Sequence, residues 1–124
     1  MFGGKLPKVF KESEACPVRN IIADLADKWS ILVILTLVEG PQRFTVVRKR
    51  VEGISQRMLT TTLRKLERDG YVKREIFAEV PPRVEYSLTP LGQSVLTPIK
   101  ELVEWADTNT DAIKKARKSY DDIK

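Results

Sequence analysis

Residues 44–92 hold the succession of patterns that most restricts what this 124-residue chain can fold into. A short helical segment ends at the tight turn Glu52-Gly53-Ile54, and a basic segment over residues 55–69 then follows a helical period. Beyond Gly70 the apolar period shortens to that of a β-strand, which predicts two strands in place of another helix. This order of elements leaves few architectures open.

The predicted helix over residues 55–69 has two different faces. At about 100° per residue, its leucines fall on one stripe and most of its cations gather on the opposite side. Ser55 stands where an N-cap is expected, and Gly70 can take the left-handed conformation after the last turn. One face is therefore expected to pack and the other to present positive charge. The packing residues are Leu59, Leu63 and Leu66, and the opposite residues are Arg57, Thr61, Arg64 and Arg68.

A tip with two adjacent prolines joins the predicted strands. Pro81 and Pro82 remove two backbone donors and stiffen residues 78–82, which suits a projecting loop and not a central strand. Arg83 is left at the projecting end. These parts predict a winged helix-turn-helix of the α+β class, mainly α-helical with a small antiparallel β-wing. The residues expected to share strand faces are Val72 and Ile76, and then Val84, Tyr86 and Leu88.

Two helices are expected before the helix-turn-helix. Cys16-Pro17 opens the first, whose apolar stripe predicts one buried face. Asp27 can cap the second, over residues 28–39, which is apolar nearly all round and is expected to be the central buried helix. The stripe of the first helix consists of Val18, Ile21, Ile22, Leu25 and Ala26.

The first half of the helix-turn-helix is expected to be short. Residues 43–44 are long enough only for a β-bridge. Thr45 can then cap a third helix that ends near Val51.

A long last helix is expected to begin at Thr89-Pro90, which supplies an N-cap and a proline at the first helical position. Pro98 predicts a kink within it. The apolar positions continue to Trp105 and Ile113, which is more than one small core needs and favours a homodimer interface over packing within one chain. The interface residues expected are Leu91, Val95, Ile99, Leu102, Val103 and Ala106.

The positive charge of the chain is concentrated in one region. Residues 41–86 contain eleven Lys/Arg against six Asp/Glu, whereas the rest of the 22 Lys/Arg and 17 Asp/Glu are balanced at eleven each. Such a local excess attracts a polyanion, although basic stretches are often only solvated surface. Nucleic acid is therefore the partner that the charge distribution favours.

Other function classes find little support in the residue inventory. The chain has no histidine, a single cysteine, no phosphate-cradling glycine loop and no nucleophile elbow, so we expect no enzyme, no metal site and no cofactor. The longest apolar run, residues 31–35, is far too short to span a membrane, and no signal-peptide pattern opens the chain. We therefore expect a cytoplasmic protein with no membrane partner.

Short motifs occur in one combination along most of the chain: Cys16-Pro17-Val18, Lys28-Trp29, Gly40-Pro41, Arg43-Phe44, Gly53-Ile54-Ser55, Met58-Leu59, Leu63 to Glu67, Asp69-Gly70, and the long segment Val80-Pro81-Pro82-Arg83-Val84-Glu85-Tyr86-Ser87-Leu88-Thr89-Pro90-Leu91-Gly92. Together they resemble the HxlR-type transcriptional regulators. The resemblance implies a homodimeric winged-helix DNA-binding regulator, related in architecture to MarR-type proteins, with N- and C-terminal helices at the dimer interface.

The resemblance spans residues 16–105 and has two departures. A glycine is common at Ala26-Asp27, and an acidic residue is common at Val46. Neither departure touches the basic helix face. The expected division is an N-terminal arm over residues 1–15, an HxlR-type DNA-binding domain over residues 16–106, and the end of the last helix with a tail over residues 107–124.

The second helix of such a fold reads base edges in the major groove with its N-terminal residues. Arg57 is the strongest candidate because a guanidinium can pair with guanine, while Gln56 can match adenine. Residues further from the groove are expected at phosphates, and Arg83 can enter the minor groove. Each arginine could instead be a solvated or salt-bridged side chain. The expected DNA-binding residues are Ser55, Gln56, Arg57, Thr60, Thr61, Arg64, Arg68, Lys73, Arg74 and Arg83.

Cys16 stands at a helix start with Arg19 within one turn, an arrangement that lowers the pKa of a thiol. The resemblance adds that several HxlR-type regulators respond to oxidants through a cysteine in this place. Cys16 is therefore a candidate redox or electrophile sensor, with a partly buried structural residue as the alternative.

The leading functional prediction is a sequence-specific, double-stranded DNA-binding regulator that acts as a homodimer on a pseudo-palindromic operator. The alternative is a winged-helix module for protein contacts or RNA binding, because the fold alone does not determine the ligand.

Overall fold

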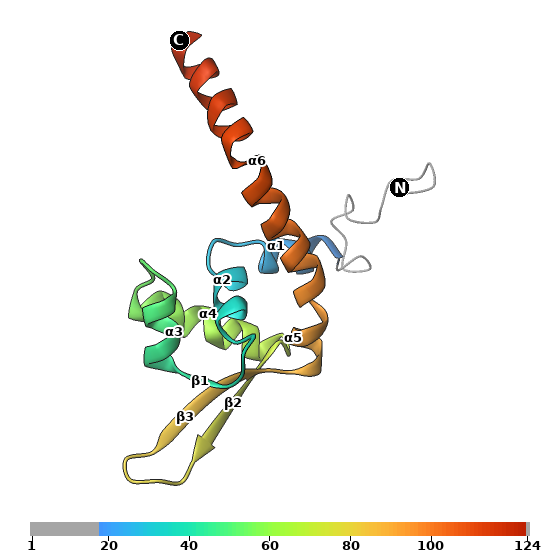
Figure 1. Cartoon of the computed structure of the whole chain (residues 1–124). Coiled ribbons are helices and arrows are strands. Elements are labelled where there is room, and N and C mark those ends of the chain that lie inside the picture. The colour runs from blue at the N-terminus through green and yellow to red at the C-terminus, as the bar shows by residue number, and fades with distance from the viewer. Residues whose placement is uncertain (1–17, 124) are drawn as a thin grey trace.

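Residues 18–123 are described by a computed structural model, and they confirm the winged helix-turn-helix (Figure 1). The structure is mostly helical with one three-stranded antiparallel sheet. In chain order the elements are α1 (Val18–Leu25), α2 (Ser30–Thr36), β1 (Gln42–Arg43), α3 (Phe44–Arg50), α4 (Gln56–Arg68), β2 (Val72–Phe77), β3 (Arg83–Leu88), α5 (Pro90–Ser94) and α6 (Leu96–Ile123).

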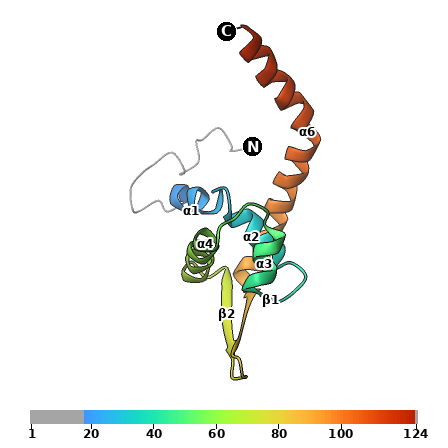
Figure 2. The same cartoon turned by 90° about the vertical axis from the view of Figure 1, so that its left-hand side faces the viewer.

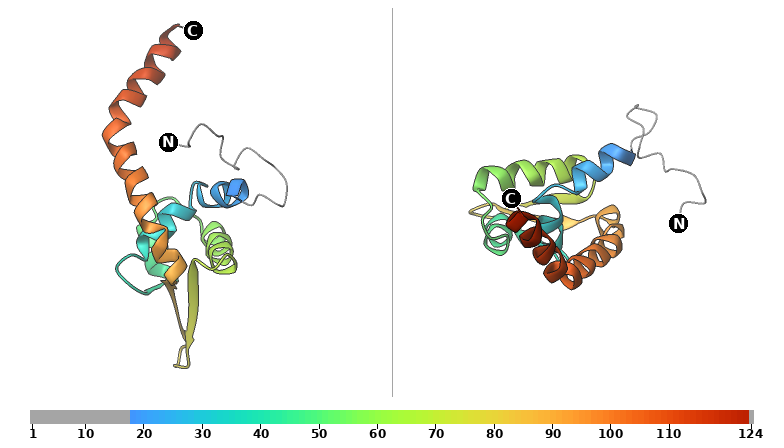
Figure 3. Two further views of the ribbon diagram at one scale, coloured as in Figure 1. Left: turned by 90° about the vertical axis from the view of Figure 1, so that its right-hand side faces the viewer. Right: turned by 90° about the horizontal axis from the view of Figure 1, so that it is seen from above.

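Helix α2 occupies the centre of the arrangement. It lies between α4 on one side and α6 on the other in the side views and in the view from above (Figures 2 and 3). The β2–β3 wing and the long α6 project from opposite ends of the molecule (Figure 1). The wing and α6 therefore present separate surfaces.

The core forms where the leucine stripe of α4 meets α2 and α3. Leu59 and Leu63 are almost completely buried, as are Ile34 of α2 and Val47 of α3. The apolar side chains leave water together, and this supplies most of the stabilisation that holds three short helices in place. The predicted packing stripe of α4 and the central position of α2 are both confirmed.

The sheet has the order β1-β3-β2, and its hairpin is the wing. β2 pairs with β3 from Val72 opposite Leu88 to Phe77 opposite Arg83. β1 adds only two residue pairs, beginning with Gln42 opposite Tyr86, which confirms a short bridge but places it at residues 42–43, one residue before the predicted 43–44. Only the base of the wing reaches the core, since Val72 is buried whereas the outer part of the hairpin is solvated.

Three predicted helix ends are confirmed by hydrogen bonds or backbone angles. The Ser55 hydroxyl accepts the Met58 amide at 3.0 Å, and the Thr89 hydroxyl accepts the Gly92 amide at 3.1 Å. Gly70 ends α4 with φ +87°, a conformation that favours glycine. A Cβ on Gly92 would lie 2.2 Å from the Tyr71 carbonyl oxygen, so α5 can pack against the wing base only with glycine there.

Two predicted helix boundaries are wrong. α2 begins at Ser30 and ends at Thr36, shorter than residues 28–39. The Asp27 carboxylate accepts the amides of both Trp29 and Ser30, and the regular helix begins at Ser30. Thr45 does not cap α3, because the helix begins at Phe44 with Arg43 in the N-cap position, two residues before the predicted cap, and has no side-chain cap.

The expectations for the outer helices also need correction. α1 has no fully buried residue, and Val18, Ile21 and Ile22 are exposed, so most of the apolar face predicted to be buried is uncovered in the single chain and only Leu25 packs against the core. The last helix is interrupted at Val95 and not at Pro98. Pro98 lies in the first turn of α6, where a missing N–H costs no intrahelical hydrogen bond.

Candidate nucleic-acid interface

The outer face of α4 is a continuous polar surface at the N-terminal and middle turns of the helix. Its lining residues form one shallow depression, and the buried leucines lie on the opposite side of the same helix. The Thr60 hydroxyl donates to the Gln56 carbonyl at 2.9 Å and retains its capacity as an acceptor. The residues that line the depression are Gln56, Arg57, Thr60, Thr61 and Arg64.

The arginines of this face carry uncompensated charge. Within residues 18–123, no ion pair involves Arg57, Arg64 or Arg68, and all three are exposed. An exposed guanidinium without an acidic neighbour offers all its donors to an incoming anion or base edge. Ser55 differs, because its hydroxyl oxygen already caps the helix.

The cations at the wing base lie close to acidic side chains. The Lys73 ammonium lies 3.7 Å from a Glu75 carboxylate oxygen, and Arg74 Nε lies 3.7 Å from Glu67. Both pairs are exposed, and such pairs contribute little free energy. Lys73 and Arg74 can therefore still turn toward a phosphate.

Arg83 is held by its own hairpin. Its guanidinium lies 4.1 Å from the Phe77 ring centroid, 3.4 Å from Glu79 and 3.3 Å from Glu85. The side chain is 29% exposed, and its Nε is buried without a hydrogen-bond partner. In this conformation Arg83 is not presented as a free cation at the wing tip, which sets it apart from the α4 arginines.

The sequence interpretation did not include a basic cluster at the end of α3. Arg48, Lys49 and Arg50 fill the last turn of that helix and are exposed. None of them belongs to an ion pair within the part of the chain that the structure describes. The run of three consecutive cations was the signal, and in this fold the first helix of the motif crosses the DNA backbone.

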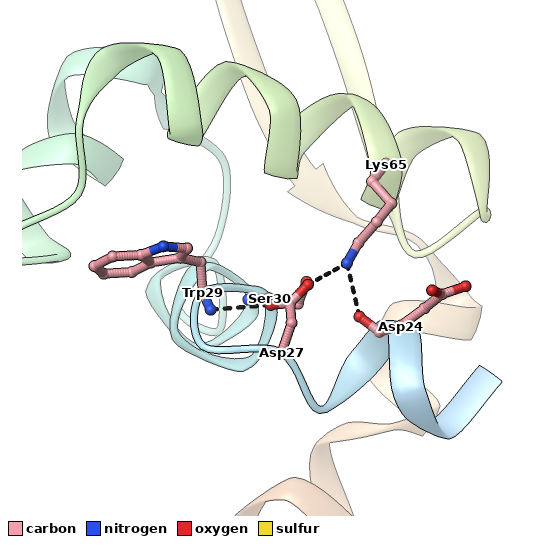
Figure 4. A network of polar contacts seen from close by, with 5 residues as sticks. All are labelled: Asp24, Asp27, Trp29, Ser30 and Lys65. Carbon is pink, nitrogen blue, oxygen red and sulfur yellow. Dashed lines mark hydrogen bonds and ion pairs between the residues drawn. The ribbon is translucent and has the colours of Figure 1, made fainter. Parts of the chain in front are cut away.

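A polar junction lies behind α4 (Figure 4). The Lys65 ammonium donates to the Asp24 carbonyl oxygen at 2.8 Å and to the Asp27 carboxylate. Asp27 also accepts the Trp29 amide at 2.9 Å, the Ser30 amide at 2.6 Å and the Ser30 hydroxyl at 2.9 Å. Burial raises the pKa of the Asp27 carboxyl, but the hydrogen bonds from Lys65, Ser30 and Trp29 outweigh it and hold that pKa below 3.8.

Two tyrosines near the wing base also have shifted pKa values. Burial raises the pKa of Tyr71, with the Asp69 and Asp24 charges acting in the same direction. Burial likewise raises the pKa of Tyr86, and the positive charges of Arg74 and Arg64 only partly oppose it. Both phenols are therefore neutral at physiological pH.

The expected dimer residues divide into two groups. Ile99 is buried, and Val95 is partly buried against the core. Leu91, Leu102 and Val103 are 51%, 53% and 43% exposed, and Ala106 is exposed. The apolar sector of α6 therefore serves the core at its beginning and remains uncovered further along.

Cys16 and the arm over residues 1–15 lie outside the described residues. Within residues 18–123, no group of three or more acidic, histidine or cysteine side chains could hold a metal ion. No helix in that range is long and apolar enough to cross a membrane.

Comparison with known proteins matches this geometry to transcription regulators. The sequence model of the HxlR-like helix-turn-helix family matches residues 24–114. The HTH-type transcriptional regulator YdeP of Bacillus subtilis (strain 168) is 42% identical over 113 residues, which cover 89% of this chain and 88% of YdeP.

Two solved structures extend the similarity to the fold. The redox regulator HypR in its reduced form superposes with a TM-score of 0.75 at 37% identity, covering 80% of this chain and 98% of that one. A transcriptional regulator of the MarR family from Porphyromonas gingivalis W83 gives 0.72 at 39% identity, covering 80% and 97%.

Proposed function

This chain belongs to the HxlR-like helix-turn-helix family of transcriptional regulators, and we propose that it reads a specific double-stranded DNA sequence as a homodimer on a pseudo-palindromic operator. The observation that carries the proposal is the outer face of α4, where Gln56, Arg57 and Arg64 line one exposed surface without acidic partners. Binding in the cytoplasm is part of the proposal.

The proposed role of each cation follows from its position. Arg57 and Gln56 lie at the N-terminal turn of α4, the part of a recognition helix that contacts base edges. Arg68, Lys73 and Arg74 follow at its end and at the wing base, where they meet phosphates. The cluster at the end of α3, made of Arg48, Lys49 and Arg50, adds phosphate contacts from the first helix of the helix-turn-helix.

Homodimerisation is supported by uncovered apolar surface. Ile21 and Ile22 of α1 and Leu102 and Trp105 of α6 are each about half exposed, an arrangement that a single soluble chain rarely maintains. A two-fold partner would cover them and place two α4 helices about 34 Å apart, or a multiple of that spacing. The operator would then be an inverted repeat.

A response to oxidants through Cys16 is part of the same proposal. Its position at a predicted helix start beside Arg19 favours the reactive thiolate. The similar protein HypR carries the name of a redox regulator. Loss of DNA binding after thiol oxidation, abolished in Cys16→Ser, is the expected result, whereas an unchanged oxidant response in Cys16→Ser rejects the sensor.

Selection of bound duplexes from a random pool at physiological salt tests the reading function. The parent should enrich an inverted repeat, and Arg57→Ala should lose the preference at one position in each half-site. Arg117→Ala is a matched control, because it removes an exposed arginine from the far end of α6. Enrichment of no sequence by the parent would contradict the proposal.

Salt dependence separates DNA reading from the alternative of a protein partner. Neutralised phosphates release counterions, so the affinity for a duplex should fall steeply with ionic strength. A flat response, or stronger binding to RNA than to duplex DNA, would favour the alternative module.

A further inference from the structure

We propose that Lys65 and Asp27 form a positioning pair that sets where α4 lies against α2, and that Lys65 is not one of the phosphate contacts, an inference that rests on the proposed DNA-reading function. The juxtaposition is unusual in one respect: Lys65 belongs to the basic recognition helix, yet its ammonium points to the protein interior side, toward the α1–α2 corner (Figure 4).

The pair joins three elements through one ammonium and one carboxylate. Lys65 donates to the carbonyl of Asp24 within α1 and to the carboxylate of Asp27 in the following turn. The same carboxylate accepts two amides and one hydroxyl at the start of α2. Displacement of α4 would therefore break contacts with α1 and α2 together.

The contacts of Lys65 and Asp27 can fix the orientation of α4 more closely than the leucine stripe can. Burial of Leu59, Leu63 and Leu66 holds α4 to the core, but apolar packing is weakly directional and tolerates small rotations of a helix. Charge-assisted hydrogen bonds require defined distances and angles. Because Lys65 directly follows Arg64, a rotation that moves Lys65 also moves the neighbouring reading residue.

The charge of Lys65 is already compensated, which distinguishes it from the α4 arginines. The Lys65 and Asp27 side chains are 31% and 37% exposed and form an ion pair. A paired ammonium adds little to the attraction of a polyanion. The lysine should therefore affect how well α4 fits one sequence and not how strongly the protein holds any DNA.

The same contacts connect the reading helix to the proposed dimer interface. The Asp24 carbonyl belongs to α1, whose exposed Ile21 and Ile22 are expected to face a partner subunit. A partner that shifts α1 would act on α4 through Lys65. The two α4 helices of a dimer would then keep one spacing on the operator.

The test compares specific and nonspecific duplex binding by the full-length protein. The probes are the inverted repeat enriched by the parent and a scrambled duplex of the same length and composition. Lys65→Met should weaken binding to the repeat about tenfold or more, the effect of misplacing a base contact, and change the scrambled duplex less than about twofold. The slope of log affinity against log salt should remain that of the parent.

Asp27→Asn changes the net charge of the protein in the opposite direction from Lys65→Met. The amide oxygen can still accept the Trp29 and Ser30 amides, so α2 keeps its cap, but the negative charge is gone. Electrostatics alone predicts tighter DNA binding after this change. The positioning pair predicts weaker binding to the repeat, and the double variant should be no weaker than Lys65→Met because both changes break one unit.

Lys118→Met is the matched control for the loss of one exposed lysine, and it lies near the far end of α6. Thermal unfolding curves of each variant give its melting temperature, and binding is measured below that temperature. The inference is overturned if Lys65→Met weakens both duplexes equally and lowers the salt slope by about one, which is the behaviour of a phosphate contact. It is also overturned if Asp27→Asn tightens binding to the repeat.

Failure of the proposed function is a different result. A parent protein that binds neither duplex overturns DNA reading itself, together with the inference that depends on it. A parent that selects the repeat while Lys65→Met behaves as Lys118→Met rejects only the positioning pair.

Discussion

Helix α4 and the β2–β3 wing both carry arginines, but they hold them in opposite ways. Arg57 and Arg64 are exposed on α4 and have no acidic partner within residues 18–123. Arg83 on the wing lies between Glu79 and Glu85 and over the Phe77 ring. Net charge already separates the two regions, since residues 56–68 hold four Lys/Arg against one Glu and residues 72–88 hold three of each. The local partners of each guanidinium show where the positive charge of the wing is compensated.

The difference extends to how each region is anchored. α4 packs a continuous buried stripe into the core, so the direction of its outer face is determined by the rest of the domain. The wing is anchored only at its base, where Val72 is buried, while Ile76 is 61% exposed. A fixed surface suits base reading, and a hairpin attached at one end suits an adjustable backbone contact.

The largest expected effect concerns the anchoring. Leu63→Ala should lower the free energy of unfolding by about 2–5 kcal/mol, because it opens a cavity under α4. Ile76→Ala on the solvated wing should change it by less than about 0.5 kcal/mol. Urea denaturation measures both values. A comparable loss from Ile76→Ala would mean that the wing packs on something, such as a second subunit, and would break the comparison.

The second effect concerns DNA affinity. Arg64→Ala should weaken binding to the selected repeat by about 1–3 kcal/mol, as expected for a guanidinium at a base edge. Arg83→Ala should cost less than about 1 kcal/mol, since Glu79 and Glu85 already compensate its charge. Fluorescence anisotropy with a labelled duplex measures both. Equal losses would indicate that Arg83 leaves its acidic partners when DNA binds.

A smaller change in DNA affinity is expected when Arg83 loses one of its acidic partners. Glu85→Gln removes one of the two carboxylates beside Arg83 and should tighten binding to any duplex by about 0.5 kcal/mol, with a steeper salt dependence. Glu104→Gln on α6 is a control for the loss of one exposed negative charge. The comparison would be sharpened if only Glu85→Gln tightens binding, and weakened if both variants do.

The smallest effect is a pH dependence of α4 anchoring. The pKa of Asp27 is below 3.8, so the ionised carboxylate stabilises the fold above that pH, and this contribution is lost as pH falls through the lowered value. Asp27→Asn should therefore destabilise the protein at pH 7 by less than about 1 kcal/mol, because both side chains of the pair are partly exposed to water. The difference between parent and variant should shrink below pH 4 in denaturation curves. A constant difference would exclude the charge as its cause.

Local signals predicted the elements that need no distant partner. The Ser55 cap, the Gly70 helix end and the Thr89-Pro90 start each depend on residues within one turn, and all three are confirmed. A local signal can also be misplaced along the chain, as at the two helix boundaries that proved wrong. The Asp27 carboxylate accepts two amides, and α2 begins at Ser30.

The part of the candidate site that lies on one helix could be predicted from the sequence. The helical period alone groups Arg57, Thr61 and Arg64 opposite the leucines, and the structure has that face exposed. Sequence reasoning favoured Arg83 as a cation for the minor groove, left a salt-bridged side chain open, and did not detect the partner of Lys65. Both depend on where a second strand or a second helix passes, which no periodicity records.

The amino-acid sequence by itself determined the order of helices and strands, the two faces of α4 and the concentration of positive charge, because these follow from residue type and spacing along one segment. Only the tertiary structure decided which cations keep their charge available. Lys65 and Asp27 are 38 residues apart in the chain, and they meet because α2 and α4 pack through apolar side chains that carry no charge themselves. Attraction between exposed charges is largely screened beyond about 10 Å, so the packing of the core selects which guanidinium and ammonium groups remain free to meet DNA.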